Sequence, residues 1–107
     1  MDLTSQKCQV QLATVLEAPD AGEYLAQVPG WEISGAAIQR RFSFKNFKQT
    51  MFFINALAWV CEQEGHHPDA RFSFGYCEVS FTTHDAGGLT LNDFICAAKL
   101  NRLISNS

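Results

Sequence analysis

The chain is poor in charged residues, and in basic residues above all. Charged residues make up 18% of its 107 positions, and eight Lys and Arg stand against eleven Asp and Glu, for a formal net charge of -3 at pH 7. Proteins that bind nucleic acid usually concentrate positive charge on one surface, whereas Arg40-Arg41 is the one basic pair here. We therefore expect no direct nucleic-acid partner.

Long hydrophobic runs are also missing. The most apolar stretch, residues 51–61 (MFFINALAWVC), is interrupted by Asn55 and is well short of the roughly 20 residues that span a bilayer. The first ten residues, MDLTSQKCQV, lack the basic start and the apolar stretch of a secretory signal. These absences favour a protein without membrane segments.

The cysteines lack the spacing of a metal site. They stand at positions 8, 61, 77 and 96 without any Cys-x-x-Cys pair, which argues against a structural zinc site of the usual cysteine type. Cys61 and Cys96 lie inside apolar stretches, as small core residues do. Such cysteines are typical of a reducing compartment, and we expect the cytoplasm.

What the chain does contain is enough apolar material for one compact domain. Apolar residues make up 47% of the sequence, and its 107 residues suffice for one core but not for two of independent size. Residues 1–19 carry no clear period, so we interpret them as an irregular N-terminal arm. Residues 20–107 are expected to form a single domain.

Helix and strand signals alternate along that domain. Capping pairs three residues apart mark helix starts at Asp20, Asn46 and Thr90, and runs of β-branched and aromatic residues between turns mark strands. Hairpins joined by one long helix are typical of an α+β fold, so we predict a four-stranded antiparallel sheet with helices packed on one face. The predicted elements, in chain order, are a helix from Asp20 to residue 28, strands at 31–33 and 37–44, a helix from Asn46 to about Glu64 that stops at Gly65, strands at 71–74 and 77–84, and a helix from Thr90.

The long predicted helix is apolar on more than one side. Its apolar residues form one stripe at helical spacing and then extend beyond that stripe. In so small a domain, such a helix is expected to cover a sheet on one side and to meet a second helix on the other, from this chain or from another subunit. The stripe comprises Phe47, Met51, Ile54, Ala58 and Cys61, and the residues that widen it are Phe52, Phe53, Leu57 and Val60.

The predicted hairpin brings together histidines that are far apart in the sequence. We expect a type II′ turn at Gly75-Tyr76, because Gly stands at its first position. This register places Phe74 opposite Cys77, and carrying it to the base of the hairpin places His67 opposite His84. Directly opposed residues have Cβ atoms about 4.5 to 5.5 Å apart.

All three histidines of the chain therefore converge on one place, which is the candidate site. Glu62, four residues before His66, lies on the last turn of the long helix and can point toward it. Pro68 disfavours helical geometry at His67, so the two adjacent imidazoles should point in different directions. Because imidazole exchanges protons near neutral pH, two or three imidazoles with one carboxylate suit an elimination or a dehydration.

Alternatives remain open for individual residues. One of the adjacent histidines, with His84 and Glu62, could supply three ligands to a metal ion, although the tight His-x-x-x-His pair of helical metal sites is missing. Asp93 is interpreted as a helix-capping residue rather than a catalytic one. Trp31 is either a core aromatic residue or a stacking platform for a ligand.

The stretch from Glu62 to Asp93 resembles the signature of the pterin-4a-carbinolamine dehydratases. In that signature an acidic residue is followed after three residues by His-His-Pro, after five more by an aromatic residue, after nine more by His, and after eight or more by Asp. The pattern is met, gap by gap, by Glu62, His66-His67-Pro68, Phe74, His84 and Asp93. A looser resemblance covers residues 20–105, through GWEI, IQRRFSFKNF and the final helix.

The resemblance implies a reaction and a set of site residues. The reaction removes water from a 4a-hydroxytetrahydropterin, the pterin substrate, and gives quinonoid dihydropterin; it belongs to the biosynthesis and recycling of tetrahydrobiopterin, the cofactor of aromatic amino acid hydroxylases. The histidines line the pterin pocket as acid and base, and neither a metal nor a bound cofactor is implied. The catalytic residues are then His66, His67 and His84, and the substrate-binding residues are Glu62, Pro68, Thr83, Asp85 and Ala86, with Trp31 as the stacking candidate.

The resemblance also implies partners and leaves an alternative function. Members of the family dimerise through sheet and helices and often form tetramers, so we expect a homodimer or homotetramer, with an aromatic amino acid hydroxylase in the same pathway; the open edges of a four-stranded sheet fit this expectation. Gly65 departs from the family, in which Asp or Asn commonly precedes the two histidines, and this departure bears on rate or stereochemical preference. The alternative is a non-catalytic protein-interaction or assembly module on the same fold.

Overall fold

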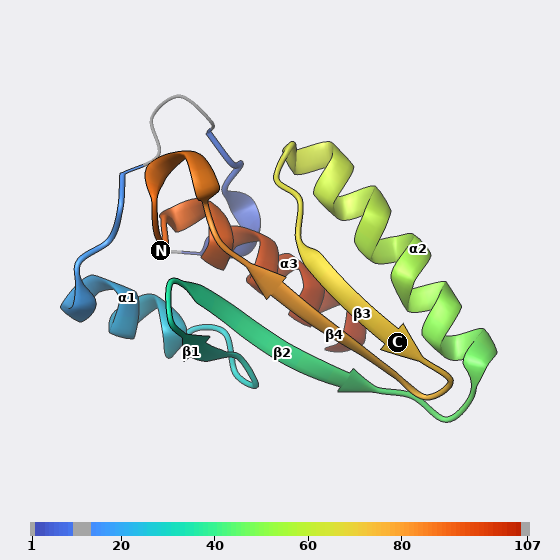
Figure 1. Ribbon diagram of the computed structural model, residues 1–107. Coiled ribbons are helices and arrows are strands. Elements are labelled where there is room, and N and C mark those ends of the chain that lie inside the picture. Colours follow the sequence, from blue (N-terminus) through green and yellow to red (C-terminus); the bar gives the residue numbers. More distant parts are fainter. Residues whose placement is uncertain (1, 10–13, 106–107) are drawn as a thin grey trace.

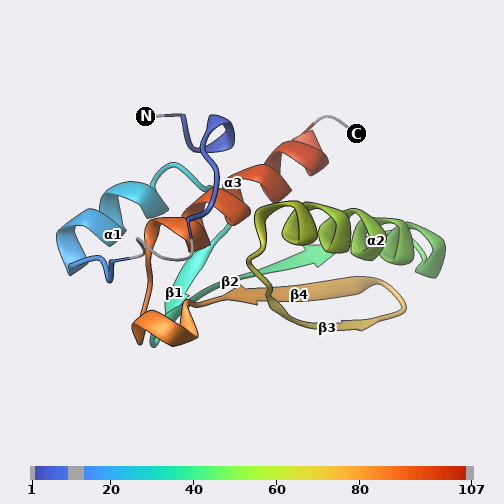
Figure 2. The same ribbon diagram turned by 90° about the horizontal axis from the view of Figure 1, so that it is seen from above.

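The computed structural model describes residues 2–9 and 14–105, which form a sheet and a layer of helices. Within these residues four strands pair antiparallel throughout, in the order β1-β2-β4-β3. Figure 1 shows the arrangement of the strands, and Figure 2 shows the α-helices on one face of the sheet. The predicted α+β class is confirmed. The elements are η1 (Leu3–Ser5), α1 (Ala18–Leu25), β1 (Glu32–Ser34), β2 (Ala37–Ser43), α2 (Phe47–Glu64), β3 (Asp69–Ser73), β4 (Tyr76–Phe81), η2 (His84–Ala86) and α3 (Leu91–Ser105).

The long helix α2 begins and ends where the sequence predicts. Asn46 Oδ1 accepts a hydrogen bond from the backbone N–H of Gln49 at 2.9 Å, and Gln49 Oε1 accepts one from the N–H of Lys45 at 3.0 Å. These side-chain oxygens satisfy N–H groups at the start of the helix that have no partner within it. At the other end Gly65 has a φ of 65°, a left-handed conformation that glycine adopts without a Cβ clash. Both predicted caps are confirmed.

The buried face of α2 differs from the predicted stripe. Phe47 and Ala58 are exposed, because apolar residues occur on several sides of α2 and hydrophobicity alone does not select the row that meets the sheet. The row that does so begins at Thr50, whose Oγ1–H donates to the backbone oxygen of Phe74 at 2.9 Å. The buried residues of α2 are Thr50, Phe53, Leu57, Val60, Cys61 and Glu64.

Across the described ranges, no helix combines the length and the apolar character needed to cross a membrane.

The N-terminal region contains more helix than the sequence predicts. Leu3–Ser5 form a 3-10 turn with Leu3 buried, inside the segment expected to be irregular. The first α-helix starts at Ala18 rather than at Asp20, because Pro19 fits the first turn of a helix, where its missing N–H is not needed. Asp20 lies within that first turn instead of capping it. Residues 1 and 10–13 of the predicted arm, and residues 106–107 of the predicted domain, lie outside the described residues.

The β3–β4 hairpin is shifted by two residues from the predicted register. Arg71 pairs with Glu78 rather than with Ser80, and the turn is Phe74-Gly75 rather than Gly75-Tyr76. The observed register places Arg71 Nη2 2.7 Å from Glu78 Oε2, an opposite-charge cross-strand pair of the kind that favours one register over another. The predicted turn and register are therefore wrong.

A two-residue shift leaves every side chain on its predicted face, because the side-chain period of a strand is two. Cys77, Val79 and Phe81 of β4 alternate with less buried residues and lie in the core. What the shift removes is the direct opposition of His67 and His84 across the hairpin. These two histidines must therefore meet by another route.

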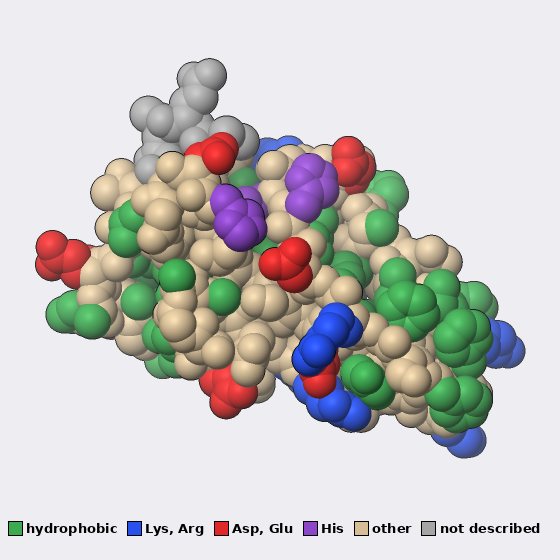
Figure 3. Space-filling view, viewed as in Figure 1, with side chains coloured by type: hydrophobic (Ala, Val, Ile, Leu, Met, Phe, Trp, Pro, Cys, Tyr) green, Lys and Arg blue, Asp and Glu red, His purple; other side chains and the backbone are tan. Residues whose placement is uncertain are grey.

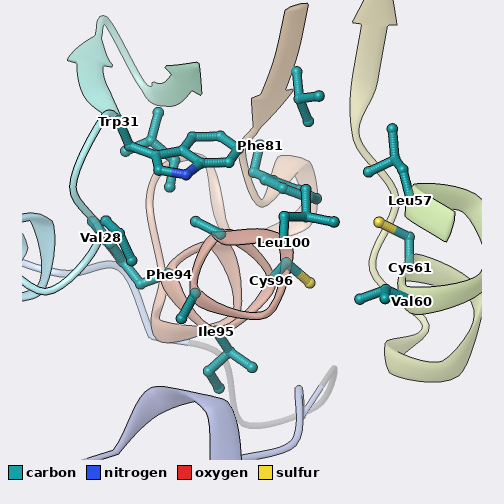
Figure 4. Close-up of a cluster of buried hydrophobic side chains, with 14 of the residues drawn as sticks. Val28, Trp31, Leu57, Val60, Cys61, Phe81, Phe94, Ile95, Cys96 and Leu100 are labelled. Atoms are coloured by element: carbon teal, nitrogen blue, oxygen red, sulfur yellow. The ribbon is translucent and has the colours of Figure 1, made fainter. Parts of the chain in front are cut away.

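Trp31 belongs to the core between the sheet and the helices. Its side chain lies with Phe81 and the buried residues of α3 in Figure 4, and the residue is 6% exposed. Its ring centroid is 5.7 Å from that of Phe81, and its Nε1–H donates to Asn101 Oδ1 at 2.8 Å. A buried indole whose N–H is satisfied is a packing element. The core interpretation of Trp31 therefore replaces the ligand-stacking one.

The last turn of α2 carries a buried ion pair. Glu64 Oε2 accepts a hydrogen bond from Lys99 Nζ at 2.5 Å, and Oε1 accepts one from the backbone N–H of Cys8 at 2.9 Å. Burial by itself raises the pKa of Glu64, but the hydrogen bonds from Lys99 and Cys8 outweigh it, so that pKa lies below the ordinary value of 4.5. This carboxylate joins the N-terminal arm, α2 and α3.

Replacing Glu64 with alanine is expected to lower the free energy of unfolding by about 3 kcal/mol, because it leaves Lys99 largely buried without its counter-charge. Since the folded-state pKa is lowered, the contribution of Glu64 is present above its ordinary pKa of 4.5 and is lost as the pH falls through the folded-state value. Urea unfolding at neutral and acidic pH measures both effects. Glu62→Ala, an exposed position on the same helix, is the control and should change stability by less than about 0.5 kcal/mol. Equal losses in the two variants would contradict the prediction.

Candidate functional site

One open hollow collects all three histidines. Its volume is about 260 Å³, and its walls come from the end of α2, the segment after β4, η2 and the first turn of α3. Figure 3 shows histidine side chains gathered on one part of the surface, with acidic side chains beside them. We call it the histidine hollow; its lining residues are Gly65, His66, His67, Thr82, Thr83, His84, Asp85 and Asn92.

The histidines meet because the chain turns back after β4, not because they pair across the hairpin. Strand β4 ends at Phe81, and the N–H of Thr83 then donates to the backbone oxygen of Gly88 at 3.2 Å. This bond closes a loop that contains η2, whose first residue is His84. The loop holds His84 beside residues 65–67, where the chain leaves α2.

His66 is the inward-facing histidine of the hollow. Its side chain is 12% exposed, and its ring stacks on Phe81 with centroids 5.8 Å apart and an angle of 15° between the planes. His66 Nε2 lies 2.6 Å from Asp93 Oδ1. An ionised carboxylate only accepts hydrogen bonds, so this contact places a proton on Nε2 and leaves Nδ1 as the nitrogen for proton exchange. Asp93 thus fixes both the position and the tautomer of the His66 ring.

Asp93 is fully buried and accepts hydrogen bonds from three groups. Besides His66, the hydroxyl of Thr83 donates to Oδ2 at 2.9 Å, and the backbone N–H of Thr90 donates to Oδ2 at 2.9 Å. The hydroxyls of Thr83 and Thr90 lie 2.8 Å apart. Such a set of donors suits a buried carboxylate, which is costly without partners. The predicted capping role is confirmed by the bond to Thr90, but the same carboxylate also holds a histidine of the site.

His67 faces outward, toward Glu62. Its side chain is 65% exposed, and its Nε2 lies 3.0 Å from Oε2 of Glu62, which is itself 75% exposed. The predicted divergence of the two adjacent imidazoles is confirmed. Glu62 reaches the histidines as predicted, but through His67, because His66 has turned inward to Asp93. An exposed pair of this kind is screened by water and holds His67 only weakly.

The remaining predicted site residues divide into three groups. Thr83 and Asp85 line the hollow, whereas Pro68 and Ala86 adjoin it in the sequence without lining it. Trp31 lies in the core, away from the hollow. The two residues beside lining positions remain able to shape the edge of the site, but Trp31 does not contribute to its wall.

Three further residues belong to the site and were not predicted there. Asp93 forms a hydrogen bond with His66, and Thr82 and Asn92 form part of the wall. The Thr-x-x-Asp capping box explains Asp93 by itself, but the position of Asp93 as the last residue of the resembled signature is a sequence signal for its second bond. No sequence signal marks Thr82 or Asn92, because their positions depend on how the loop after β4 closes.

Two of the three imidazoles of the hollow are each held by a different carboxylate. Asp93 contacts His66, and Glu62 contacts His67. Among the described residues, no group of three or more His, Cys, Asp or Glu side chains is arranged to hold a metal ion. Larger hollows, of about 560 and 630 Å³, contain no histidine. The arrangement therefore suits proton transfer by separately oriented imidazoles.

Comparison with known proteins gives a consistent result. The family model described as Pterin 4 alpha carbinolamine dehydratase matches residues 14–103. A Nitrosomonas europaea protein, named provisionally as a pterin-4-alpha-carbinolamine dehydratase, is 46% identical over 108 residues, which cover 98% of this chain and 96% of that protein.

Two solved structures share the fold. The crystal structure of a transcriptional coactivator/pterin dehydratase from Brucella melitensis has a TM-score of 0.80 and 30% identity, over 84% of this chain and 98% of that one. A pterin dehydratase-like protein identified as a RuBisCO assembly factor in the alpha-carboxysome has a TM-score of 0.63 and 26% identity, over 76% of this chain and 96% of that one.

Proposed function

Because this chain belongs to the pterin-4-alpha-carbinolamine dehydratase family, we propose that it dehydrates a 4a-hydroxytetrahydropterin to the quinonoid dihydropterin. The observation that carries the proposal is the histidine hollow, in which His66, His67 and His84 lie together and a buried carboxylate orients the first of them. In this role the protein recycles tetrahydrobiopterin for an aromatic amino acid hydroxylase in the cytoplasm.

The proposed reaction needs one proton donor and one proton acceptor. The C–O bond to the 4a-hydroxyl breaks and water leaves, while the neighbouring ring nitrogen loses its proton and a C=N bond forms. One imidazolium gives a proton to the departing hydroxyl, and one neutral imidazole takes the proton from the nitrogen, so the protein ends with the number of protons it began with. Imidazole is the side chain that can both give and take a proton near neutral pH.

The walls of the hollow offer polar groups for the pterin ring. At about 260 Å³ the hollow is smaller than most ligand pockets, which start at about 300 Å³, so we infer that the reacting edge of the pterin enters it and the rest stays outside. Asp85 supplies a hydrogen-bonding group at the wall, Thr83 contacts the substrate beside it while its hydroxyl stays bonded to Asp93, and Pro68 and Ala86 shape the edge. Gly65 contributes no side chain, and a Cβ at this position would meet no atom within 4 Å, so this part of the wall offers the substrate no polar side chain.

The direct test measures the decay of enzymatically generated 4a-hydroxytetrahydropterin by ultraviolet absorbance, with and without the protein. Free imidazole at three times the protein concentration controls for buffer catalysis. Acceleration that is lost in His67→Ala supports the dehydratase and its site together. A folded sample that leaves the decay rate unchanged contradicts the proposal.

A second candidate function, assembly with other protein chains, is favoured by a group of exposed aromatic side chains. Phe52 and Trp59 on one face of α2 are 64% and 66% exposed, and Phe72 and Phe74 of the hairpin are 49% and 64% exposed. Figure 3 shows hydrophobic side chains gathered over the hairpin tip and the adjoining end of α2. Large aromatic side chains exposed in such groups mark interaction sites. The similarity to a RuBisCO assembly factor points in the same direction.

We propose that other copies of this chain cover part of that surface, in a homodimer or homotetramer. Strand β3 is an edge strand, and all of its residues are exposed. An edge strand presents unpaired backbone groups that a second chain can pair with. The aromatic face of α2 offers a second surface, so the two together allow assembly beyond a dimer.

Replacing Trp59 with glutamate is expected to weaken self-association by about 30-fold, because a buried tryptophan at an interface contributes about 2 kcal/mol. Light scattering during size-exclusion chromatography, over a dilution series, measures the change in mass. Gln27→Glu adds the same charge at an exposed position outside α2 and should leave the mass unchanged. An unaltered dilution curve for Trp59→Glu would exclude this face of α2 from the assembly.

A further inference from the structure

Three cysteine thiols lie together where the N-terminal arm meets the two long helices. Cys8 Sγ is 3.7 Å from Cys96 Sγ, although the two residues are 88 positions apart in the sequence. Cys61 of α2 lies opposite Cys96 of α3 (Figure 4). The fourth cysteine, Cys77, belongs to β4. All four are free thiols.

The three clustered thiols differ in their access to solvent. Cys61 is 2% exposed and Cys96 is 0% exposed, whereas Cys8 is half-buried. A dissolved oxidant therefore reaches Cys8 first. Hydrogen bonds with Cys61 and with Cys8, together with burial, raise the pKa of the Cys96 thiol. Cys96 thus stays protonated and is a poor first nucleophile, because the thiolate is the reactive form.

We propose that a small hydroperoxide converts Cys8 and Cys96 into a reversible disulfide that fixes the N-terminal arm to α3. In the first step the Cys8 thiolate attacks a peroxide oxygen, the O–O bond breaks, and Cys8 becomes a sulfenic acid as the other oxygen leaves and is protonated. In the second step the Cys96 sulfur attacks the Cys8 sulfur, the S–OH bond breaks, and the hydroxide leaves as water with the Cys96 proton. With hydrogen peroxide, two thiols are oxidised, one peroxide is reduced, and two waters form.

The arm is already docked where the disulfide requires it. The backbone N–H of Cys8 donates to Glu64 Oε1 at 2.9 Å, and the N–H of Gln9 donates to Asn92 Oδ1 at 2.9 Å. The sulfurs have to approach from 3.7 Å to the bonded distance of about 2.05 Å. That approach is small and involves side chains whose backbones are already held.

The disulfide would act next to the histidine hollow. Asn92 lines that hollow and also contacts the N-terminal arm. Cys8 Sγ lies 3.5 Å from the backbone oxygen of Asn92, and Asn92 Nδ2–H donates to the backbone oxygen of Gln9 at 3.3 Å. Oxidation therefore adds a covalent link to a contact between the arm and α3 that is non-covalent in the reduced protein.

The test treats the fully reduced protein with equimolar hydrogen peroxide, blocks the remaining thiols with iodoacetamide, and maps the peptides by mass spectrometry. The expected product is a linked peptide pair that joins Cys8 to Cys96, with the loss of two hydrogens. The midpoint of thermal unfolding should rise on the order of 10 °C, because the cross-link closes a loop that spans most of the chain. Dithiothreitol should reverse both changes.

Variants decide whether this pair of cysteines is responsible. Cys8→Ser, at a half-buried position that tolerates the change, should abolish both the linked peptides and the rise in midpoint, whereas Cys77→Ala should retain them. Irreversible oxidation of Cys8 without a link, a Cys61–Cys96 link, or a link between the Cys8 residues of two molecules would each overturn the proposal.

Discussion

Replacing His84 with alanine is expected to lower kcat/KM for the 4a-hydroxytetrahydropterin by at least about 100-fold, which is the contribution of one general acid or base. His84 is exposed at the start of η2, so its loss removes a proton carrier without opening a cavity in the core. The same result is expected for His67, whose side chain is 65% exposed. Both variants should keep their free energy of unfolding within about 0.5 kcal/mol of the unmodified protein.

Rapid-mixing absorbance measures turnover, and urea unfolding of the same preparations measures stability. Gln63→Ala is the matched control, because Gln63 is exposed near the end of α2 but outside the hollow, and it should change neither quantity. Turnover within about threefold of the unmodified protein in either histidine variant would contradict general acid–base catalysis by that residue. Unfolding of both variants, seen by circular dichroism, would instead make the histidines structural.

The sequence predicted those parts of the fold that local chemistry decides. The boundaries of α2 follow from Asn46 and Gly65, because a side-chain oxygen at one end and a left-handed glycine at the other satisfy local requirements of the helix. The α+β class follows from the order of such signals. These predictions are correct because no contact with a distant segment is needed to make them.

The register of the β3–β4 hairpin could not be predicted in the same way. Glycine at position 75 is compatible with either position of a two-residue turn, and the choice depends on partners across the sheet. Glu78 forms ion pairs with Arg71 of β3 and with Arg41 of β2, with nitrogen–oxygen distances of 2.7 and 2.9 Å. That pairing between three strands appears only when the sheet is assembled, so a two-strand argument misses it.

The convergence of the histidines was predicted correctly by a route that the structure does not use. His67 and His84 share the hollow even though they are not opposed in the hairpin, because the loop closed by Thr83 and Gly88 carries His84 back toward α2. Both histidines lie outside the strands, at the same end of the hairpin. The prediction was correct about that end of the sheet and wrong about the direct pairing of the two residues.

Asp93→Asn is expected to lower kcat by about 100-fold or more, because this residue sets the tautomer of His66. One carboxylate oxygen accepts from His66 and the other accepts from Thr83 and Thr90. An amide has one acceptor oxygen, so its NH₂ group must face either the His66 nitrogen or the N–H of Thr90. The free energy of unfolding should also fall by about 1 to 3 kcal/mol, the cost of a buried donor without an acceptor.

Thr90→Val separates the loss of stability from the loss of turnover. This variant keeps the backbone N–H of residue 90, which donates a hydrogen bond to Asp93. It removes the Thr90 hydroxyl, which lies 2.8 Å from the Thr83 hydroxyl and accepts a hydrogen bond from the N–H of Asn92. It should cost about 1 kcal/mol of stability while leaving kcat within about threefold, since His66 keeps its partner. If Thr90→Val lost as much turnover as Asp93→Asn, general loosening of the start of α3 would explain both.

The double variant His66→Ala/Asp93→Asn gives the sharper test of how Asp93 acts. If Asp93 works through His66, removing both should lower kcat no further than removing His66 alone, so the two effects are far from additive. If Asp93 instead contributes to the site by itself, the losses should multiply. Losses that multiply would therefore show that Asp93 does not act through His66, and would overturn its role in orienting that ring.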